Sequence, residues 1–552
     1  MTSPSDETPD VHGAYPRLSP EQIQALAMLG ERRSTHAGDV LYRGGDTSCD
    51  FFVILAGTVA VVEGYGGEDE RLVAVHGPGR FVGELGLLIG QPVFLSAVVR
   101  EPGAVLRIAT SRLRELVAND PELGDLILRS LLLRRSILVG LGTGLRIVGS
   151  RFSPDTRRLR EFAARNRLPH RWVDLEEDPG AERLLRTLGV ATEETPIVIV
   201  RGSEVLRNPT NHELARVLGL LDRSNGEVSC DLLVVGAGPA GLAAAVYGAS
   251  EGLRTMAVEG VATGGQAGTS SRIENYLGFP SGISGAELAE RAEIQAAKFG
   301  ARITVPAEAA AIEPCGNGYA VMCEHADTIR ARSVVIATGV RYRKLPIPGI
   351  QAFEGLGVYY AATVAEAQLC AGAPVVVVGG GNSAGQATVF LSEQVPIVHL
   401  VVRERTLGEH MSRYLADRIE RIPNVAVHTS TELRELCGDR ALEAVVAEHN
   451  LSGECMTLAA RAVFVFIGAS PHTAWLGGLL DLDDGGYIRT GRDAAAAGRD
   501  AGTPHEPLLL ETSQPAVFAA GDVRAGSVKR VATAVGEGSM AVRLVNERLA
   551  AR

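Results

Sequence analysis

Two glycine-rich turns constrain the fold of this chain more than any other feature. They lie 143 residues apart, at 236–241 (Gly-Ala-Gly-Pro-Ala-Gly) and 379–384 (Gly-Gly-Gly-Asn-Ser-Ala), and each follows an apolar run typical of a strand. In such a strand, turn and helix, the first glycine makes the tight bend and the second lets the backbone approach a pyrophosphate. The N-terminus of the helix favours phosphate charge. The turns therefore predict two dinucleotide sites, formed by Gly236, Gly238, Ala240 and Gly241 and by Gly379, Gly381, Asn382, Ser383 and Ala384.

An acidic residue supports the first of these sites. Glu259 ends the next predicted strand, eighteen residues after Gly241, where a carboxylate binds ribose hydroxyls. Glycines also occur in ordinary loops, so a lone glycine-rich turn is weak support for a nucleotide site. The apolar strands at 232–235 and 374–378, which precede the turns, make the interpretation more specific.

Length, charge and cysteine content narrow the class of protein. A chain of 552 residues is too long for one hydrophobic core and predicts three or four domains. Its net charge of −11 disfavours nucleic acid as a partner. No apolar run reaches membrane-spanning length and residues 1–20 are polar and acidic, so we expect no membrane partner and a cytoplasmic location. The seven cysteines form no C-x-x-C pair and no metal-ligand spacing with histidine, which predicts free, largely buried thiols and no metal site.

The first unit, residues 1–140, is predicted to be a β-roll closed by helices. A helical stretch from Ser111 to about Leu138 follows a series of short strands. Glycines separate these strands, which include 38–42, 51–55 and 57–62. The arrangement resembles a cyclic-nucleotide-binding domain.

The resemblance is strongest at 81–88, Phe-Val-Gly-Glu-Leu-Gly-Leu-Leu, which is similar to that family's phosphate-binding cassette. It implies that backbone N–H groups face a cyclic phosphate and that Glu84, between Gly83 and Leu85, holds the ribose hydroxyl. The family also places an arginine after the cassette proline, where this chain has Val93. Loss of that charge-assisted contact removes about 1.5 to 3 kcal/mol of binding energy. Two interpretations stay open: a cyclic nucleotide effector, or a scaffold or dimerisation module in which Glu84 is an ordinary exposed carboxylate.

Residues 145–221 predict a small α/β domain. Its elements follow the order strand, helix, strand, helix, two strands and helix, with a Thr195-Pro196 step before the third strand. This order resembles the thioredoxin or glutaredoxin fold, in which that proline is cis and lines the active site. The C-x-x-C pair of that family falls at Ser150 and Ser153, and a serine does not exchange with a disulfide. The resemblance therefore implies substrate docking or a scaffold role.

From Ser229 to its end, the chain resembles the low-molecular-weight thioredoxin reductases of the pyridine nucleotide-disulfide oxidoreductase family. The resemblance implies an FAD domain split into 229–345 and 476–552, with an NAD(P)H domain inserted at 346–475. Together with the first two units it predicts an α/β multidomain protein, which consists of a β-roll with helices, a thioredoxin-like domain and two Rossmann-like domains.

The resemblance assigns the first site to FAD. The first turn and Glu259 match its pyrophosphate and ribose sites, and 264–266 and 274–280 match segments near the ribityl chain and the flavin ring. Asp522 is implied to bond a ribityl hydroxyl, and a helix beginning near Ala532 is implied to point its positive end at the flavin, which stabilises the reduced anion. The matched FAD residues are Gly236, Gly238, Ala240, Gly241, Glu259, Gly265, Gln266, Asn275, Ala337, Thr338, Gly339, Gly521, Asp522, Lys529, Arg530, Val531 and Ala532.

The second site is assigned to the nicotinamide cofactor. After the strand at 397–402 the family has two arginines that recognise the 2′-phosphate of NADPH, and Arg403 matches the first. Glu404 displaces the second, and Arg405 or Arg413 compensates in this interpretation. An arginine at this place favours NADPH, because a free 2′-hydroxyl is bound by a carboxylate. NADH and a merely solvated charge cluster are the alternatives.

The family's redox disulfide has no counterpart at the matching place. The stretch 357–364 carries Ala361 and Val364 where the family has two cysteines, and Tyr359 and Thr363 support this register. Only a thiolate forms the mixed disulfide of a dithiol relay, so no catalytic residue is placed there.

Three functions remain open from the sequence. The leading hypothesis is an FAD-dependent NAD(P)H oxidoreductase that passes hydride from NADPH to FAD and on to an unidentified acceptor, such as a quinone, a dye, oxygen or a protein carrier. The second is a ligand-regulated sensor or scaffold flavoprotein. The third is an atypical thioredoxin-disulfide reductase that uses another cysteine, such as Cys370, which is otherwise expected to be a buried thiol. Homodimer formation is expected by analogy with the family.

Overall fold

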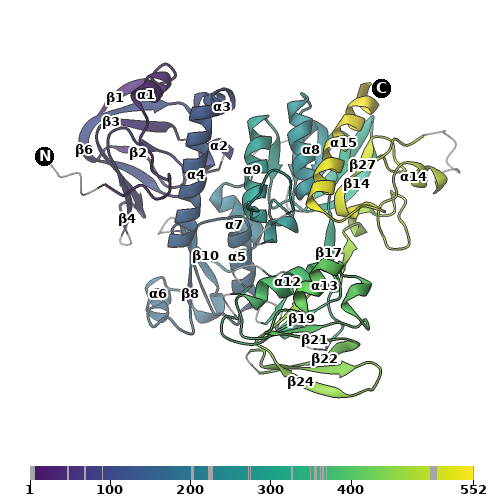
Figure 1. Ribbon diagram of the computed structural model, residues 1–552. Helices are drawn as coiled ribbons and strands as arrows, with labels where there is room; N and C mark the ends of the chain where they lie inside the picture. The colour runs from purple at the N-terminus through teal and green to yellow at the C-terminus, as the bar shows by residue number, and fades with distance from the viewer. Residues whose placement is uncertain are drawn as a thin grey trace.

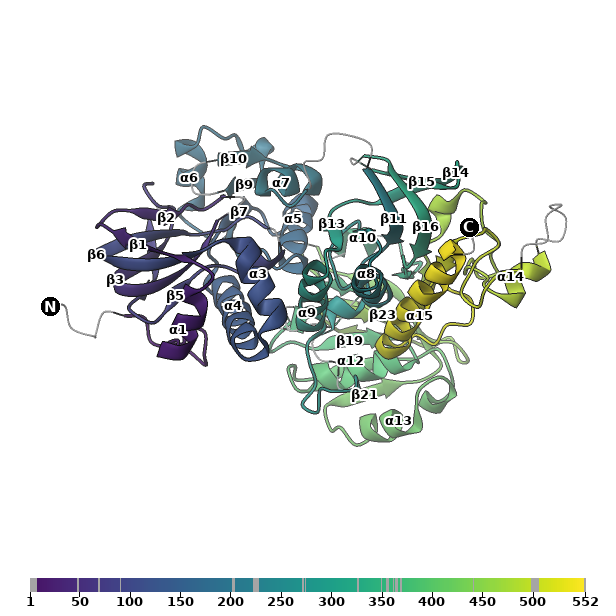
Figure 2. The same ribbon diagram turned by 90° about the horizontal axis from the view of Figure 1, so that it is seen from above.

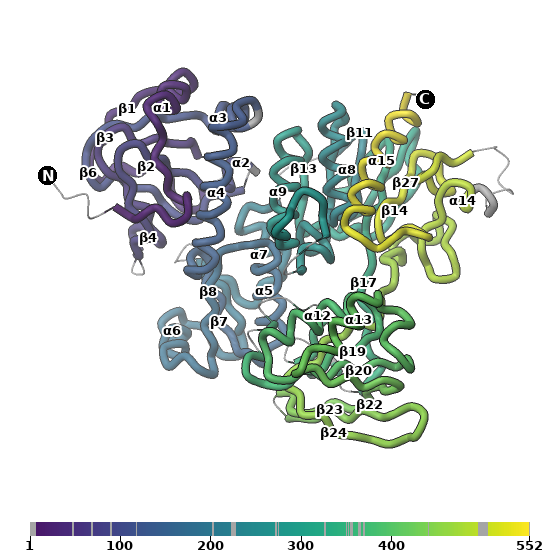
Figure 3. Tube along the Cα trace, in the orientation of Figure 1, coloured from purple at the N-terminus to yellow at the C-terminus, as the bar shows by residue number. Residues whose placement is uncertain are grey.

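The structure is a computed structural model, and Figure 3 traces the chain from the purple β-roll through a blue α/β unit to a teal and yellow half with a green insertion. The β-roll and helix α15 (Val531–Ala550) lie toward opposite ends of the molecule in both views (Figures 1 and 2). The residues described are 7–46, 49–67, 70–89, 91–200, 204–221, 228–270, 273, 275–324, 327–348, 350–353, 357–360, 362, 366–367, 370–439, 441–497 and 506–550. Among them, no helix combines the length and the apolar character needed to cross a membrane.

The first unit is the predicted β-roll. Its sheet has the order β1-β6-β3-β4, with β2 paired to β6 and β5 paired to β3. The predicted break between strands 51–55 and 57–62 was wrong, because Gly57, with a φ of 81°, and register shifts on both sides of it bend a single strand without ending it. The strands are β1 (Glu31–Thr35), β2 (Val40–Tyr42), β3 (Phe51–Glu63), β4 (Arg71–His76), β5 (Phe81–Val82) and β6 (Ser96–Ile108), and the first helices are α1 (Pro20–Ala27) and α2 (Gly86–Ile89).

The predicted helical stretch after the β-roll is confirmed, and it divides into two helices. The carboxylate of Asp120 accepts the N–H of Glu122 at 3.1 Å, so it ends α3 (Thr110–Asn119) and caps α4 (Pro121–Leu141). Pro121 suits the first turn of a new helix and would interrupt the interior of a continuous one.

The second unit has the predicted order of strands and helices, and its Thr195–Pro196 peptide is cis as expected. Its sheet has the order β10-β9-β7-β8, and side chains of β7, β9, α5 and α7 fill a hydrophobic core. Residues 201–203, between β9 and β10, lie outside the described residues. The elements are β7 (Leu145–Gly149), α5 (Pro154–Arg165), β8 (His170–Asp174), α6 (Ala181–Thr187), η2 (Thr192–Glu194), β9 (Ile197–Val200), β10 (Glu204–Arg207) and α7 (Asn211–Leu218).

The third unit is a large sheet with the order β13-β12-β11-β16-β15-β14 and with β27 added to β16. Strands β13, β12, β11, β16 and β27 are parallel, and their apolar runs are buried on both faces. The strands are β11 (Val228–Val235), β12 (Thr255–Val258), β13 (Arg302–Thr304), β14 (Ala309–Cys315), β15 (Gly318–Cys323), β16 (Ile329–Ile336) and β27 (Val517–Ala519). The helices, besides α15, are α8 (Pro239–Ser250), η3 (Ala267–Thr269), α9 (Gly285–Lys298), η5 (Ala474–Leu476), α14 (Arg492–Ala497) and η6 (Gly521–Val523).

The fourth unit, green in Figure 1, is inserted between β16 and β27. It has a parallel sheet of order β18-β25-β19-β20-β21 and an antiparallel sheet of order β22-β23-β24, and the short antiparallel pair β17–β26 connects it to the third unit. The strands are β17 (Val340–Tyr342), β18 (Val358–Tyr359), β19 (Val375–Val378), β20 (Val398–Val401), β21 (Val425–His428), β22 (Thr431–Cys437), β23 (Ala444–His449), β24 (Cys455–Ala459), β25 (Ala462–Val465) and β26 (Ala469–Pro471). The helices are α10 (Ile350–Phe353), α12 (Asn382–Ser392), η4 (Leu407–Glu409) and α13 (Arg413–Ile419).

Helix α9 joins the third unit to the first two. Ile294 on α9 is buried within the hydrophobic core of the β-roll, and α9 packs against α2, the helix of the 81–88 cassette. Figure 2 shows α9 facing α4 of the β-roll. Arg167 of the α/β unit forms a 2.9 Å ion pair with Glu290 on α9, and both side chains are largely buried. The front of the chain and the C-terminal half therefore share a packed interface.

Candidate functional site

The first glycine turn leaves no room for side chains. Gly236 donates its N–H to the carbonyl that ends β12 at 2.8 Å, which ties the turn to this strand. A Cβ on Gly236, which has a φ of 101°, would lie 2.4 Å from Ala337 O, and one on Gly241 would lie 1.8 Å from Gly236 O. Gly238 is the N-cap of α8, and its Cα faces Gly265. Packing therefore shapes the turn at Gly236 and Gly241. At Gly238 the backbone is open to close approach, as a pyrophosphate requires.

Glu259 lies beside this turn. Its Oε2 accepts the N–H of Ala237 at 2.9 Å, and its Oε1 accepts the N–H of Val261 at 3.1 Å. A carboxylate oxygen has two lone pairs, so each oxygen keeps one for a further donor such as a ribose hydroxyl. The carboxylate is thus held next to the turn and still has acceptor capacity.

Motifs that are far apart in the sequence meet at the first turn. A Cβ on Gly521 would lie 2.9 Å from the side chain of Ala240 and 3.7 Å from that of Ala534, so η6, α8 and the first turns of α15 converge. Helix α15 begins at Val531, one residue before Ala532. Helix N-termini carry partial positive charge, so this arrangement fits a dinucleotide whose ring becomes anionic on reduction.

Charged side chains surround Asp522 in η6. Burial raises the pKa of the Asp522 carboxyl above its ordinary value, while the charge of Lys529 lowers it and that of Glu537 raises it. Glu537 accepts the N–H of Gly521 at 2.7 Å, which fixes the turn before Asp522. Lys529 donates to the hydroxyl of Tyr487 at 2.8 Å. The region therefore offers a half-buried acid beside a lysine, and Arg530 next to it is exposed.

Two other matched side chains are tied to the backbone near the turn, and a third is exposed. Gln266, next to Gly265, donates to a backbone carbonyl at 3.1 Å, and Thr338, next to Ala337, donates to another at 2.8 Å. Gly339 follows with a φ of 63°. Asn275 is exposed, and Glu274 lies outside the described residues.

The second glycine turn repeats the backbone of the first. Gly379 donates its N–H to the carbonyl that ends β20 at 3.0 Å, and a Cβ on it would lie 2.3 Å from Phe466 O. Gly381 is the N-cap of α12, and no described atom outside its immediate neighbours lies within 4 Å of where its Cβ would be. The Oδ1 of Asn382 accepts the N–H of Ser412, the residue before α13, at 2.7 Å. The remaining matched residues are Ser383, which is exposed, and Ala384, which is buried.

A carboxylate lies against the second turn. Glu404 is 12% exposed, and a Cβ on Gly380 would lie 2.6 Å from its Oε2. Its Oε1 accepts the Nε–H of Arg403 at 2.9 Å, whereas its Oε2 is buried with no partner among the described residues. The side chain of Arg403 is 72% exposed, and Arg405 is exposed as well. In the sequence, Glu404 was noted only because it stands where the family has an arginine. The signal that could have identified it is an acid near the end of a strand, as at Glu259.

Comparison with known proteins matches both the front and the C-terminal half of the chain. Residues 230–538, more than half of the chain, match the profile of the pyridine nucleotide-disulphide oxidoreductase family. The chain belongs to this family. Residues 32–120 match the cyclic nucleotide-binding domain.

The oxidoreductase is similar to thioredoxin reductases in sequence and fold. The thioredoxin reductase of Treponema pallidum (strain Nichols) is 36% identical over 320 residues, which cover 57% of this chain and 95% of that protein. The 34.2 kDa protein in rubredoxin operon of Clostridium pasteurianum is 33% identical over 316 residues, 57% of this chain and 96% of that protein. The Lactococcus lactis thioredoxin reductase in its FR conformation superposes with a TM-score of 0.53 at 27% identity, over 58% of this chain and all of that one. The two turns above provide backbone geometry that fits two dinucleotides.

The place of the family's disulfide is described only in part in this oxidoreductase, because Ala361 and Val364 lie outside the described residues. Tyr359, on β18, packs against Phe464 with ring centroids 5.4 Å apart. Tyr360 stacks on Tyr342 of the connecting strand β17 at 6.5 Å. Aromatic contacts therefore hold this segment to both the inserted sheet and its connection.

All seven cysteines of the oxidoreductase are free, as expected. Cys370 is 2% exposed, and burial raises the pKa of its thiol to about 11. Such a thiol carries almost no thiolate at neutral pH, so it is a poor nucleophile. The predicted burial is confirmed for Cys370, Cys49 and Cys230, whereas it was wrong for Cys455, which is exposed in the three-stranded sheet.

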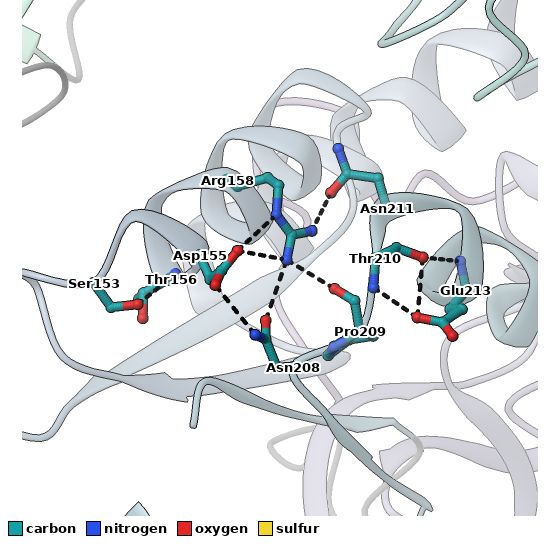
Figure 4. A network of polar contacts seen from close by, with 9 residues as sticks. All are labelled: Ser153, Asp155, Thr156, Arg158, Asn208, Pro209, Thr210, Asn211 and Glu213. Carbon is teal, nitrogen blue, oxygen red and sulfur yellow. Dashed lines mark hydrogen bonds and ion pairs between the residues drawn. The ribbon is translucent and has the colours of Figure 1, made fainter. Parts of the chain in front are cut away.

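The serines of the α/β unit have structural contacts. The Oγ of Ser150 donates to Glu176 at 2.7 Å, and the Oγ of Ser153 accepts the N–H of Thr156 at 3.3 Å as the N-cap of α5. Figure 4 shows Arg158 of the same helix linking Asp155, Asn208, Asn211 and the carbonyl of Pro209. Polar contacts thus brace this part of the oxidoreductase, at the positions where the resemblance to thioredoxins implies a C-x-x-C pair.

Glu84 of the cassette is buried, so the interpretation as an ordinary exposed carboxylate was wrong. It is 8% exposed, between Gly83, with a φ of 159°, and the buried Leu85. Its Oε1 accepts the N–H of Leu95 at 2.9 Å, and its Oε2 accepts the N–H of Phe94 at 3.0 Å. The carboxylate therefore accepts hydrogen bonds from the two backbone N–H groups that follow Val93, the position at which the family has an arginine.

Proposed function

We propose that the chain is an FAD-dependent NAD(P)H oxidoreductase that passes hydride from the nicotinamide to the flavin and electrons to an acceptor other than a dithiol at 361–364. The FAD domain is formed by 229–345 and 476–552, and the NAD(P)H domain by 346–475. The observation that carries the proposal is the convergence of the first glycine turn, η6 and the start of α15 at one place, while a second turn of the same geometry lies in the inserted domain. Two dinucleotides in one chain are what a hydride transfer between two cofactors requires.

In this proposal the protein binds and orients the cofactors. When bound, FAD accepts a hydride and releases electrons singly or in pairs. Glu259 would accept hydrogen bonds from ribose hydroxyls, and the N-terminus of α8 would face the phosphates. Asp522 would accept a hydrogen bond from a ribityl hydroxyl, and the N-terminus of α15 would favour negative charge on the flavin ring. The second turn positions the nicotinamide cofactor through Gly379 and Gly381.

The acceptor is proposed to be a quinone, a dye, oxygen or a protein carrier of single electrons. A dithiol relay needs a thiolate near the flavin. Cys370, the cysteine nearest in sequence to residues 361–364, is buried and has a raised pKa. The flavin must therefore deliver electrons without a protein disulfide in this segment.

Anaerobic stopped-flow mixing of the FAD-loaded protein with NADH or NADPH tests the first half-reaction. We expect the flavin absorbance to bleach, and the absence of bleaching with both nucleotides would overturn the proposal. A screen of quinones, ferricyanide, oxygen and a small disulfide then identifies the acceptor class. Cys370→Ser should keep full turnover with every accepted compound, and a selective loss of disulfide reduction would instead support the atypical disulfide reductase.

A second candidate function is a reductase whose rate responds to a cyclic nucleotide bound by the β-roll. The packing of α9 against the cassette helix α2 favours it, because α9 also contacts η3 beside the FAD residues. A ligand that moves α2 would press on a helix of the FAD domain. Calorimetric titration with cyclic AMP and cyclic GMP, combined with nucleotide oxidation rates, tests this role. Neither heat nor a rate change would leave the β-roll as a scaffold.

A further inference from the structure

We propose that Glu404 makes the second dinucleotide site selective for NADH over NADPH. The inference rests on the proposed function, in which this site binds a nicotinamide dinucleotide. It reverses the preference expected from Arg403 alone.

The position of Glu404 relative to the glycine turn is the first argument. The carboxylate follows β20, the strand whose last carbonyl accepts the N–H of Gly379 at 3.0 Å. Its Oε2 lies so close to the turn that a Cβ on Gly380 would be 2.6 Å away. In a strand, turn and helix of this kind, the residues that follow the second strand meet the adenosine ribose. Glu404 therefore lies where the 2′-oxygen of a dinucleotide is recognised.

The unpaired oxygen is the second argument. Glu404 is 12% exposed, and its Oε2 is buried without a hydrogen-bond donor among the described residues. A buried acceptor without a partner is costly, so a donor that arrives with a ligand is favoured. The ribose of NADH brings a 2′-hydroxyl, which donates. The ribose of NADPH brings a phosphate with about two negative charges at neutral pH, which repels a carboxylate.

The arginines do not offset this repulsion. Arg403 already donates its Nε–H to Glu404 at 2.9 Å, and its side chain is 72% exposed. Arg405 is exposed, and Arg413 is 94% exposed and lies 3.9 Å from Asp417. Attraction between a phosphate and exposed cations is weakened by water and salt. The buried carboxylate next to the turn therefore decides the preference.

Calorimetric titration of the oxidised, FAD-loaded full chain with NAD⁺ and NADP⁺ tests the inference without turnover. We expect NAD⁺ to bind at least about tenfold more tightly than NADP⁺, a difference typical of one gained or lost charged contact. Glu404→Gln removes the charge and keeps the shape, and we expect it to reduce the ratio of the two dissociation constants by about tenfold or more. Glu420→Gln, the same chemical change at an exposed carboxylate after α13, serves as the matched control and should leave the ratio unchanged.

The ribose end can also be tested alone. Competition between AMP and adenosine 2′,5′-bisphosphate should favour AMP in the unchanged protein and lose that preference in Glu404→Gln. Flavin content and thermal unfolding show whether the variant is folded. Equal or tighter binding of NADP⁺ to the unchanged protein would overturn the inference and leave the proposed function intact. If neither nucleotide binds and neither bleaches the flavin, the proposed function itself fails.

Discussion

The two glycine turns share a backbone and differ in the acid that follows the next strand. In the first turn Gly236 bonds to the last residue of β12 at 2.8 Å, and Glu259 comes directly after that strand. In the second turn Gly379 donates its N–H to the last residue of β20 at 3.0 Å. The residue directly after that strand is the fully buried Val402, and the acid is Glu404, two positions later.

The difference between the two acids fits the proposed use of each site. Both oxygens of Glu259 accept backbone N–H groups, one from Ala237 in the turn and one from Val261, so the protein itself holds this carboxylate in place. Glu404 keeps one buried oxygen without a donor among the described residues, so the second site is completed only by a ligand. A preformed site suits a cofactor that stays bound, whereas a site with one unmet hydrogen bond suits a cofactor that binds and leaves in each cycle.

The largest effect should come from closing the first turn. Gly241→Ala places a Cβ 1.8 Å from the carbonyl oxygen of Gly236, and the backbone on both sides is packed. We expect the free energy of unfolding to fall by about 1 to 3 kcal/mol and flavin content to fall more than about tenfold. Flavin absorbance per protein and thermal unfolding measure both.

A contrasting change is Gly381→Ala in the second turn, because no described atom outside its immediate neighbours lies within 4 Å of the added Cβ. Flavin content should remain that of the unchanged protein. Loss of flavin in this variant, or full flavin in Gly241→Ala, would contradict the view that packing closes the position of Gly241 and leaves that of Gly381 open.

A smaller effect is expected from Glu259→Gln. In the carboxylate each oxygen accepts one backbone N–H. The NH2 group of the amide donates and does not accept, so one charge-assisted contact is lost. We expect a loss of about 1.5 to 3 kcal/mol, or about 10- to 100-fold in FAD affinity, with no change in the preference between NAD⁺ and NADP⁺. Fluorescence titration of the flavin-free protein with FAD gives the affinity. A shift in nicotinamide preference would show that the two turns are not independent.

The smallest effect concerns the pH dependence of the first site. Burial raises the pKa of Asp522 above its ordinary value, so the folded state favours the protonated carboxyl. This contribution to stability is complete below the ordinary pKa of an aspartate and is lost as the pH rises through the raised value. The flavin-free protein should therefore lose stability relative to Asp522→Asn as the pH rises above the ordinary pKa of an aspartate. If the melting temperatures of the two proteins change with pH in the same way, this prediction is contradicted.

The sequence predicted the parts of the fold that depend on local patterns. Glycines followed by small residues after apolar runs located both turns, and the start of α15 was placed within one residue. The order of elements in the α/β unit and its cis Thr195–Pro196 peptide were also correct. The turns and the order of elements depend on neighbouring residues, so they are readable without the folded chain, whereas the start of α15 and the cis peptide came from the resemblance to known families.

The features that were missed depend on residues brought together by folding. Gly57 looks like a strand end in sequence, but pairing with β6 on both sides of it continues β3. Glu84 looks exposed because the amides that it binds, at Phe94 and Leu95, lie ten and eleven positions away. Glu404 stood between two arginines, and although its place near a strand end was a local signal, the direction of its side chain along the glycine turn was not visible in the sequence. Side-chain direction is set by tertiary packing, which a single sequence does not contain.

Ile294 has a consequence for anyone who shortens or recombines this chain. Its side chain is buried in the core of the β-roll, and Glu290 on the same helix pairs with Arg167. A fragment that starts at β11 would carry an apolar side chain and an unpaired acid on its surface, which favours aggregation. The segment before β11 is therefore not a removable accessory, and a C-terminal fragment would need a polar replacement of Ile294 on α9.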